Sequence, residues 1–100
     1  MGTLYVNKLL PTSGNDIEVE ATGLIKIKDT TTSSASQGGT IRLISDDGAA
    51  MADDHRLGAL EFAGAEDASS TITVGAKIEA ICDAGWSASE NGAALLFYTT

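Results

Sequence analysis

The sequence predicts an all-β protein built from short strands joined by tight turns. Its clearest strand is the run TITVGAKIEAIC at residues 71–82, in which apolar and polar positions alternate over most of the length. A period of two is typical of a half-buried strand, because successive side chains point to opposite faces of a sheet. Shorter runs of this kind follow residue 39 and are separated by acidic turns that contain glycine. Aromatic residues make up only 5% of the chain, which predicts a thin core.

The run at 71–82 divides its side chains between two faces. The predicted polar face consists of Thr73, Gly75, Lys77 and Glu79, and Ile81 interrupts it. The predicted apolar face consists of Ile72, Val74, Ala76, Ile78, Ala80 and Cys82. Cys82 is the single cysteine of the chain, so no intramolecular disulfide is available. Its position predicts a small buried side chain rather than a nucleophile.

Residues 1–14 form a short leader, in which Leu4 and Val6 alternate with Tyr5. Pro11 ends any strand here, and the residues that follow it are a turn signal. No apolar core of a signal peptide is present in this segment. The leader is either a strand that docks on a neighbouring protein or a flexible end.

Residues 15–29, NDIEVEATGLIKIKD, contain two alternating runs separated by TGL at 22–24. A hairpin with its loop at 22–24 places Glu18 opposite Lys28 and Val19 opposite Ile27. Cross-strand pairs of this kind each contribute roughly 0.2–1 kcal/mol. In the alternative, each half is a strand in a stack of several chains, and the charges form ladders between chains. The sequence does not distinguish these two arrangements.

The segment TTTSSASQGG at residues 30–39 is a linker, because it is small, polar and glycine-containing. It divides the chain into a leader and hairpin at 1–29 and a β module at 40–100. Within the module, strands are predicted at 40–45, 57–63, 71–82 and 93–99. Turns are predicted at 46–48, 64–67 and 83–85, and one helical turn at 49–55.

The charge balance argues against several classes of partner. The chain carries 14 acidic and 6 basic residues, for a net charge of −8. An acidic surface repels phosphate backbones and anionic lipids, so we expect no nucleic-acid partner. No run of about 18 apolar residues is present, so we expect no membrane insertion. One domain of 100 residues with a thin core is only modestly stable alone, which predicts stabilisation by association.

No group of residues predicts catalysis, a cofactor or a firm metal site. His55 is the only histidine and follows Asp53 and Asp54, so a weak cation site is one interpretation. The ligand spacing of a calcium loop is missing and a lone histidine fits zinc poorly, so a polar turn is the simpler interpretation. Nucleophilic catalysis needs a nucleophile, a base and an orienting group. One histidine and one cysteine do not suggest such a set. We therefore expect no enzyme and no cofactor.

Trp86, in AGWSASENGAA, is predicted to anchor a corner of the core. The alternative is an exposed side chain that contacts a sugar or a protein. The residues expected to build the core, within and between chains, are Leu60, Phe62, Ile72, Val74, Ile78, Trp86, Leu96 and Tyr98.

Residues 39–100 resemble a module of tailed-bacteriophage tail fibre and tailspike-like proteins. The resemblance rests on GTIRLISDDGAA, DDHRLGALEFAGAED and TVGAKIEAICDAGWSASENGAALLFYTT. The most distinctive parts are HRLGALEFAG and GAALLFYTT, and the leader is more loosely similar to the start of such fibres. The resemblance implies an intertwined or axially packed homotrimer, in which three chains bury together what one chain cannot.

The same resemblance implies a virion structural protein. The expected role is the virion-proximal part of a tail fibre, which serves host attachment and contacts itself and other virion proteins. Complete fibres usually continue past a segment like LLFYTT into a receptor-binding tip, so two alternatives stay open. One is a capsid decoration protein that stabilises the phage head, which would place the chain on the capsid surface rather than the tail. The other is a small cellular β-sandwich binding domain.

Overall fold

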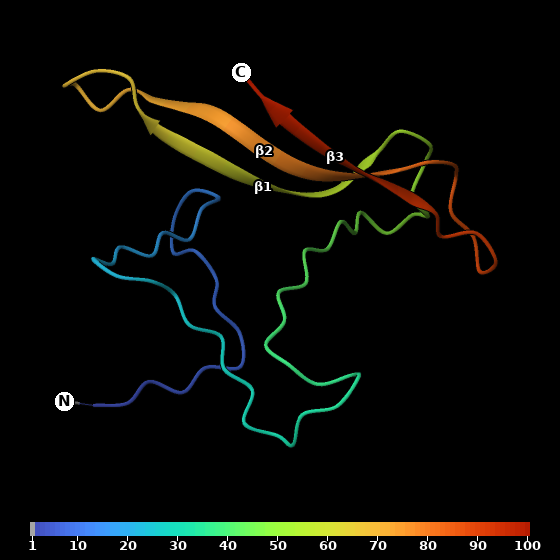
Figure 1. Ribbon diagram of the computed structural model, residues 1–100, viewed down its shortest axis with the longest axis horizontal. Coiled ribbons are helices and arrows are strands. Elements are labelled where there is room, and N and C mark those ends of the chain that lie inside the picture. The colour runs from blue at the N-terminus through green and yellow to red at the C-terminus, as the bar shows by residue number, and fades with distance from the viewer. Residues whose placement is uncertain (1) are drawn as a thin grey trace. The chain divides into compact units, whose positions relative to one another are not determined.

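The computed structural model describes residues 2–100, and these contain three antiparallel strands and no helix. The strands are β1 (Arg56–Ala65), β2 (Ile72–Cys82) and β3 (Ala93–Thr99). They form one sheet in the order β1-β2-β3, a meander with β2 at its centre (Figure 1). The all-β prediction is therefore confirmed, and the strands predicted at 57–63, 71–82 and 93–99 correspond to β1, β2 and β3.

β2 lies at the centre because it pairs with β1 along one edge and with β3 along the other. It is the longest strand, at 11 residues, and isoleucine, valine and alanine fill most of its apolar positions. Isoleucine and valine are β-branched and favour a strand. Three strands are also the smallest sheet that is stable without a partner element.

The turn between β1 and β2 is held by the Asp67 carboxylate. Its Oδ1 accepts hydrogen bonds from the backbone N–H groups of Ser69 at 2.9 Å and Thr71 at 3.1 Å. Hydrogen bonds from Thr71, and then from Ser69, lower the pKa of Asp67. Ser70 adopts the left-handed region with φ 61°, which the turn imposes on a non-glycine residue. The predicted turn at 64–67 begins two residues later, because β1 continues to Ala65.

Two units divide the chain, Met1–Thr40 and Ile41–Thr100. In the second unit, residues 41–55 precede β1 without a strand or helix, so the strand at 40–45 and the helical turn at 49–55 were wrong predictions. Asp54, within 49–55, adopts the left-handed region with φ 65°, which a helical turn does not allow. Asp46 and Asp47 also fix the chain at the start of that segment. Their carboxylates accept hydrogen bonds from the N–H groups of Gly48 and Ala49, both at 3.0 Å. Such side-chain bonds offer the backbone an alternative to helix.

In the first unit, residues 2–40 contain no strand, so the hairpin predicted within residues 15–29 is not formed. An isolated two-stranded hairpin is marginal in water, and no third strand of this unit supports it. The apolar side chains that would have shared one face, Ile17, Val19, Ile25 and Ile27, are all exposed. The alternative for residues 15–29, in which the charged side chains of neighbouring chains form ladders, stays a prediction.

The segment at 30–39 is a closed loop rather than an extended spacer. Asp29 ties its two ends together, because its carboxylate accepts from the N–H of Thr31 at 2.8 Å and of Gly38 at 3.0 Å. Hydrogen bonds from the Thr31 hydroxyl, the Thr31 N–H and Gly38 lower the pKa of Asp29. The backbone of Gly39 passes so close to the Ile27 carbonyl that a Cβ would clash with it.

Almost nothing is buried within a single chain. Among residues 2–100, only Cys82 and Glu79 are buried, at 1% and 7% exposed. The accessible area is 9008 Å². A compact monomer of this mass, 10.2 kDa, exposes roughly 5,300 Å². The chain therefore exposes about 3,700 Å² more than a self-sufficient globule would.

Candidate interaction surface

The register of the sheet places both phenylalanines and several large aliphatic side chains on one side. Directly opposite residues of neighbouring strands share a face. Leu60 of β1 lies opposite Ile78 of β2, which lies opposite Phe97 of β3. We call this side the apolar face; it consists of Gly58, Leu60, Phe62, Ala76, Ile78, Ala80, Cys82, Ala93, Leu95, Phe97 and Thr99. None of these residues carries a charge.

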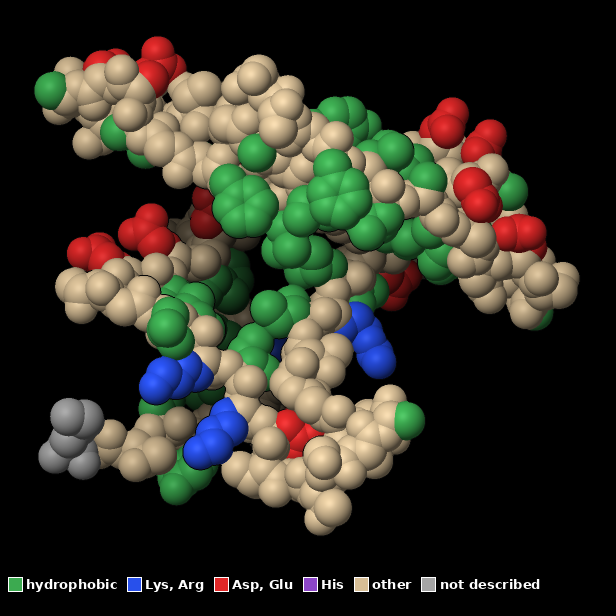
Figure 2. Space-filling model, viewed as in Figure 1, with side chains coloured by type: hydrophobic (Ala, Val, Ile, Leu, Met, Phe, Trp, Pro, Cys, Tyr) green, Lys and Arg blue, Asp and Glu red, His purple; other side chains and the backbone are tan. Residues whose placement is uncertain are grey.

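Most of the large side chains on the apolar face are open to solvent. Phe97 is 72% exposed, Leu95 62%, Phe62 59% and Leu60 50%. Hydrophobic side chains gather over the strands in the space-filling view (Figure 2). Contiguous exposed apolar surface of this kind marks an interaction site in soluble proteins.

A shallow hollow lies at one part of the apolar face. It measures about 270 Å³, and its lining includes Leu43, Leu60, Ile78 and Leu95, together with Glu79 of β2. Its floor is low because Gly58 has no side chain. A Cβ at Gly58 would lie 2.8 Å from the Leu43 Cβ, so a glycine is required where Leu43 approaches β1.

The opposite side of the sheet carries the charged side chains. We call it the charged face; it consists of Ala59, Glu61, Ala63, Val74, Lys77, Glu79, Ile81, Ala94, Leu96 and Tyr98. Oε2 of Glu79 lies 3.2 Å from Nη1 of Arg56 and 3.3 Å from Nζ of Lys77. The Lys77 ammonium also lies 4.9 Å from the centre of the Tyr98 ring, within cation–π range.

The pKa of Glu79 is lowered although its side chain is buried. Desolvation alone raises the pKa, because burial disfavours the charged carboxylate. Hydrogen bonds from Arg56 and Lys77, the charge of Lys77 and a contribution from Tyr98 outweigh that effect. Glu79 is thus a carboxylate whose negative charge is compensated by two neighbouring cations.

A β-bulge at Gly75 moves two apolar residues from one face to the other. Phe62 lies opposite Ala76 but Ala63 lies opposite Val74, so β2 has one extra residue there. Such an insertion reverses the alternation beyond it. Val74 and Ile72 therefore share the side of Ala63, whereas the uninterrupted alternation predicted them beside Ile78.

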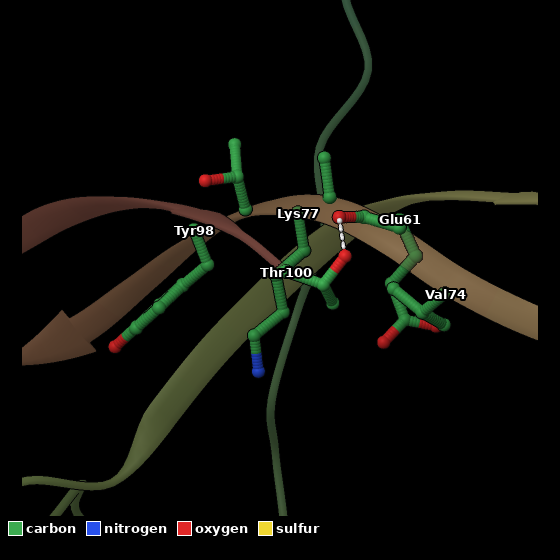
Figure 3. Close-up of a pocket in the computed structure, with 8 residues that line it drawn as sticks. Glu61, Val74, Lys77, Tyr98 and Thr100 are labelled. Atoms are coloured by element: carbon green, nitrogen blue, oxygen red, sulfur yellow. Dashed lines mark hydrogen bonds between the residues drawn. The ribbon is translucent and has the colours of Figure 1, made fainter.

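The bulge borders a second hollow, of about 250 Å³, on the charged face. Its lining includes Glu61, Val74, Lys77 and Tyr98 (Figure 3). The free carbonyl of Gly75 accepts the N–H of Thr100 at 3.0 Å and its hydroxyl at 3.3 Å. The carbonyl of the extra residue is thus satisfied by the end of β3.

The structure places the predicted core residues in three locations. Leu60, Phe62 and Ile78 lie on the apolar face. Leu96 and Tyr98 lie on the charged face, opposite Glu79 and Lys77, and the bulge adds Ile72 and Val74 to that side.

Trp86 lies outside the sheet, in the connection between β2 and β3, and is partly buried. Its N–H donates to the Met51 carbonyl at 2.8 Å and its Nε1 donates to the Gly92 carbonyl at 2.9 Å. Trp86 thus joins the chain before β1, through its backbone N–H, to the end of the connection that leads into β3, through its ring.

Sequence reasoning missed three residues of the apolar face and its hollow: Leu95, Phe97 and Leu43. The run AALLFYT has no alternation, so composition did not show which of its side chains share a face with Ile78. Only the register with β2 decides it. The signal for Leu43 was weaker still, because it requires knowing that Gly58 is a contact point.

Residues 2–100 contain no group of three or more His, Cys, Asp or Glu side chains placed to hold a metal ion. Asp53 and Asp54 lie in a turn beside His55, where Asp54 adopts φ 65° and its N–H donates to the Cys82 carbonyl at 3.0 Å. In the same part of the chain, no helix has the length and apolarity to cross a membrane.

The geometry defines a class of protein: a small antiparallel β protein with an unpartnered apolar face and a charged reverse side. No family model, no curated protein and no solved structure matches the chain.

Proposed function

We propose that this chain is a virion structural protein that works as a homotrimer in a phage tail fibre and serves host attachment. The observation that carries the proposal is the exposed apolar face, centred on Leu60, Ile78 and Phe97. A chain that buries only Cys82 and Glu79 needs neighbours to bury the rest. The resemblance of residues 39–100 to phage fibre modules supplies the kind of assembly in which those neighbours occur.

The first unit supports a docking role for the leader. Large apolar side chains are exposed along its length, without a strand or helix to gather them, namely Leu4, Tyr5, Val6, Leu9, Leu10, Ile17, Val19, Leu24, Ile25 and Ile27. Such a segment has more to gain by ordering on another protein than by folding on itself. In the fibre, it would contact a tail protein.

Function in this role is mechanical rather than chemical. Three chains on one axis present the same contacts three times, and contacts that are weak alone become strong together. The acidic surface, with a net charge of −8, favours solubility of such an assembly and disfavours nucleic-acid binding.

The leader also favours a second candidate, capsid decoration. A segment with exposed apolar residues suits the clamping of neighbouring shell subunits as well as it suits docking on a tail. A cellular β-sandwich is less favoured, because residues 2–100 form a single sheet and provide no second sheet to cover the apolar face.

The proposal is tested in two stages. Light scattering of the purified chain at several concentrations is expected to give three times the chain mass, and a persistent monomer would contradict the homotrimer. Gold-labelled antibodies against the chain are then applied to particles from cells that express the gene. Label on tails supports the fibre, label on heads supports decoration, and unlabelled particles contradict both.

A further inference from the structure

We infer that the apolar face is the surface through which copies of this chain join, with the Phe97 ring of one copy entering the hollow beside Gly58 of the next. This inference rests on the homotrimer proposed above and names the surface that would hold it together. It also excludes the charged face from the centre of the assembly.

The distribution of charge points to a second copy as the occupant. Identical chains with a net charge of −8 repel one another wherever acidic side chains meet. The apolar face is free of charge, whereas Glu61 and Glu79 lie on the other side of the sheet. Two copies that meet through their apolar faces oppose no like charges across the strands.

The face also carries both halves of a complementary contact. Phe97 projects from β3 and is the most exposed large side chain of the sheet, at 72%. The hollow of about 270 Å³ beside Gly58 lies on the same face and is lined mainly by aliphatic side chains. An apolar cavity of about 150 Å³ already holds benzene, so a phenyl ring fits this space. A surface that carries both a projection and a hollow can bind copies of itself, and a head-to-tail contact gives a closed ring when its rotation is that of the ring, here the threefold rotation of the proposed trimer.

The apolar face offers large exposed side chains to the contact, because Phe97 is 72% exposed, Leu95 62% and Phe62 59%. A stable interface buries about 800 Å² on each partner, so these side chains would have to form its centre. A central aromatic side chain in an apolar pocket is also the usual form of an energetic hot spot.

The test compares two substitutions of adjacent residues that point to opposite faces. Phe97→Gln removes the ring from the apolar face, and Tyr98→Gln makes a matched change on the charged face. The full chain and both variants are measured by sedimentation over a range of concentrations. Phe97→Gln is expected to raise the concentration for half-assembly by at least roughly 30-fold, and Tyr98→Gln by less than about threefold.

The outcomes separate this inference from the proposed function. If Phe97→Gln assembles like the unmodified chain, the apolar face is not the interface between copies, whereas the proposed fibre role is unaffected. If the unmodified chain assembles through Phe97 but particles carry no label, the fibre role is wrong while the face stands. A monomeric unmodified chain overturns the face directly.

A second measurement covers the case in which Phe97→Gln does not fold. A photo-reactive benzoylphenylalanine replaces Phe97 in the full chain, and irradiated material is separated by mass and digested. Cross-links between two chains at Leu43, Leu60 or Leu95 support the inference. Cross-links between chains that fall on Glu61, Lys77 or Leu96 overturn it, and so does the absence of any product of twice the chain mass.

Discussion

Nη1 of Arg56 lies 3.2 Å from Oε2 of Glu79, and this contact joins the first residue of β1 to the most deeply buried charge of β2. Lys77, two residues before Glu79 on the same strand, approaches the same oxygen. The three side chains compensate one another where a lone buried carboxylate would be costly. The charged face is therefore held by a specific network rather than by scattered surface charges.

The first prediction concerns the pH dependence of stability. The pKa of Glu79 is lower in the folded chain than its ordinary value of 4.5, which the unfolded chain is expected to show. Its stabilising contribution is therefore complete above the unfolded pKa and is lost as the pH falls through the folded pKa. Urea unfolding of the unmodified chain and of Glu79→Gln, followed by far-UV circular dichroism, should show a difference in midpoint at pH 7 that disappears in strong acid.

Glu61→Gln is the matched control, because Glu61 is an exposed carboxylate on the same face and lies opposite Lys77. It should leave the midpoint nearly unchanged. The pKa values of Asp29 and Asp67 are also lowered, but both residues are present in every variant and cancel in the comparison. A Glu79→Gln chain with the same pH profile as the unmodified chain would show that the network does not stabilise the fold.

The second prediction concerns the contact between Gly58 and Leu43. In Gly58→Ala, the new methyl group would lie 2.8 Å from the Leu43 Cβ and 3.1 Å from its Cδ1. Overpacking of this kind costs about 1–3 kcal/mol. The free energy of unfolding, measured with urea, should fall by that amount.

A double-mutant cycle identifies the cause. Leu43→Gly removes the Cβ that the new methyl group meets, so Gly58→Ala should cost much less in that background. Gly64→Ala, on the same strand with nothing within 4 Å of the new atom, should change stability by less than about 0.5 kcal/mol. If the two changes at 43 and 58 are additive, Leu43 does not lie against β1.

The sheet was predictable because its signals are local. Alternation along β2, and turns such as the one at Asp67, depend on residues close together in sequence. The face on which each side chain lies was not predictable in this way, because it depends on the pairing between strands. One extra residue at Gly75 exchanges the sides of Ile72 and Val74, and nothing in the run TITVGAK announces it.

The residues before β1 were less predictable for a different reason. Residues 40–45 and 15–29 have strand-like patterns, but a strand also needs a partner that completes its hydrogen bonds. Within residues 2–55 no such partner is present in the single chain. Burial of Glu79 was also missed, because its side of β2 reads as polar and its two cations come from β1 and β2.

The third prediction concerns the Trp86 ring. Trp86→Phe keeps most of the apolar surface but removes the Nε1 donor to the Gly92 carbonyl. The expected cost is about 0.5–1.5 kcal/mol, the usual net value of one hydrogen bond. Unfolding is followed by circular dichroism, because the chain has no other tryptophan. Ser89→Ala, in the same connection but exposed, should stay within about 0.5 kcal/mol, and an equal loss in both variants would contradict the anchoring role.

The fourth prediction uses Cys82 as a reporter of sheet opening. Its side chain is 1% exposed, and its backbone N–H donates to the His55 carbonyl at 2.9 Å. A thiol reagent should therefore reach it only when the end of β2 opens. If that opening costs about 3 kcal/mol, the native chain reacts roughly 100-fold more slowly than the urea-unfolded chain. Equal rates would show that this end of the sheet is not formed in solution.

Because the chain has no other cysteine, the rate needs no correction for a second thiol, and Phe97→Gln can be measured in the same way. If assembly through the apolar face also steadies the sheet, that variant should lose protection at Cys82, whereas Tyr98→Gln should keep it.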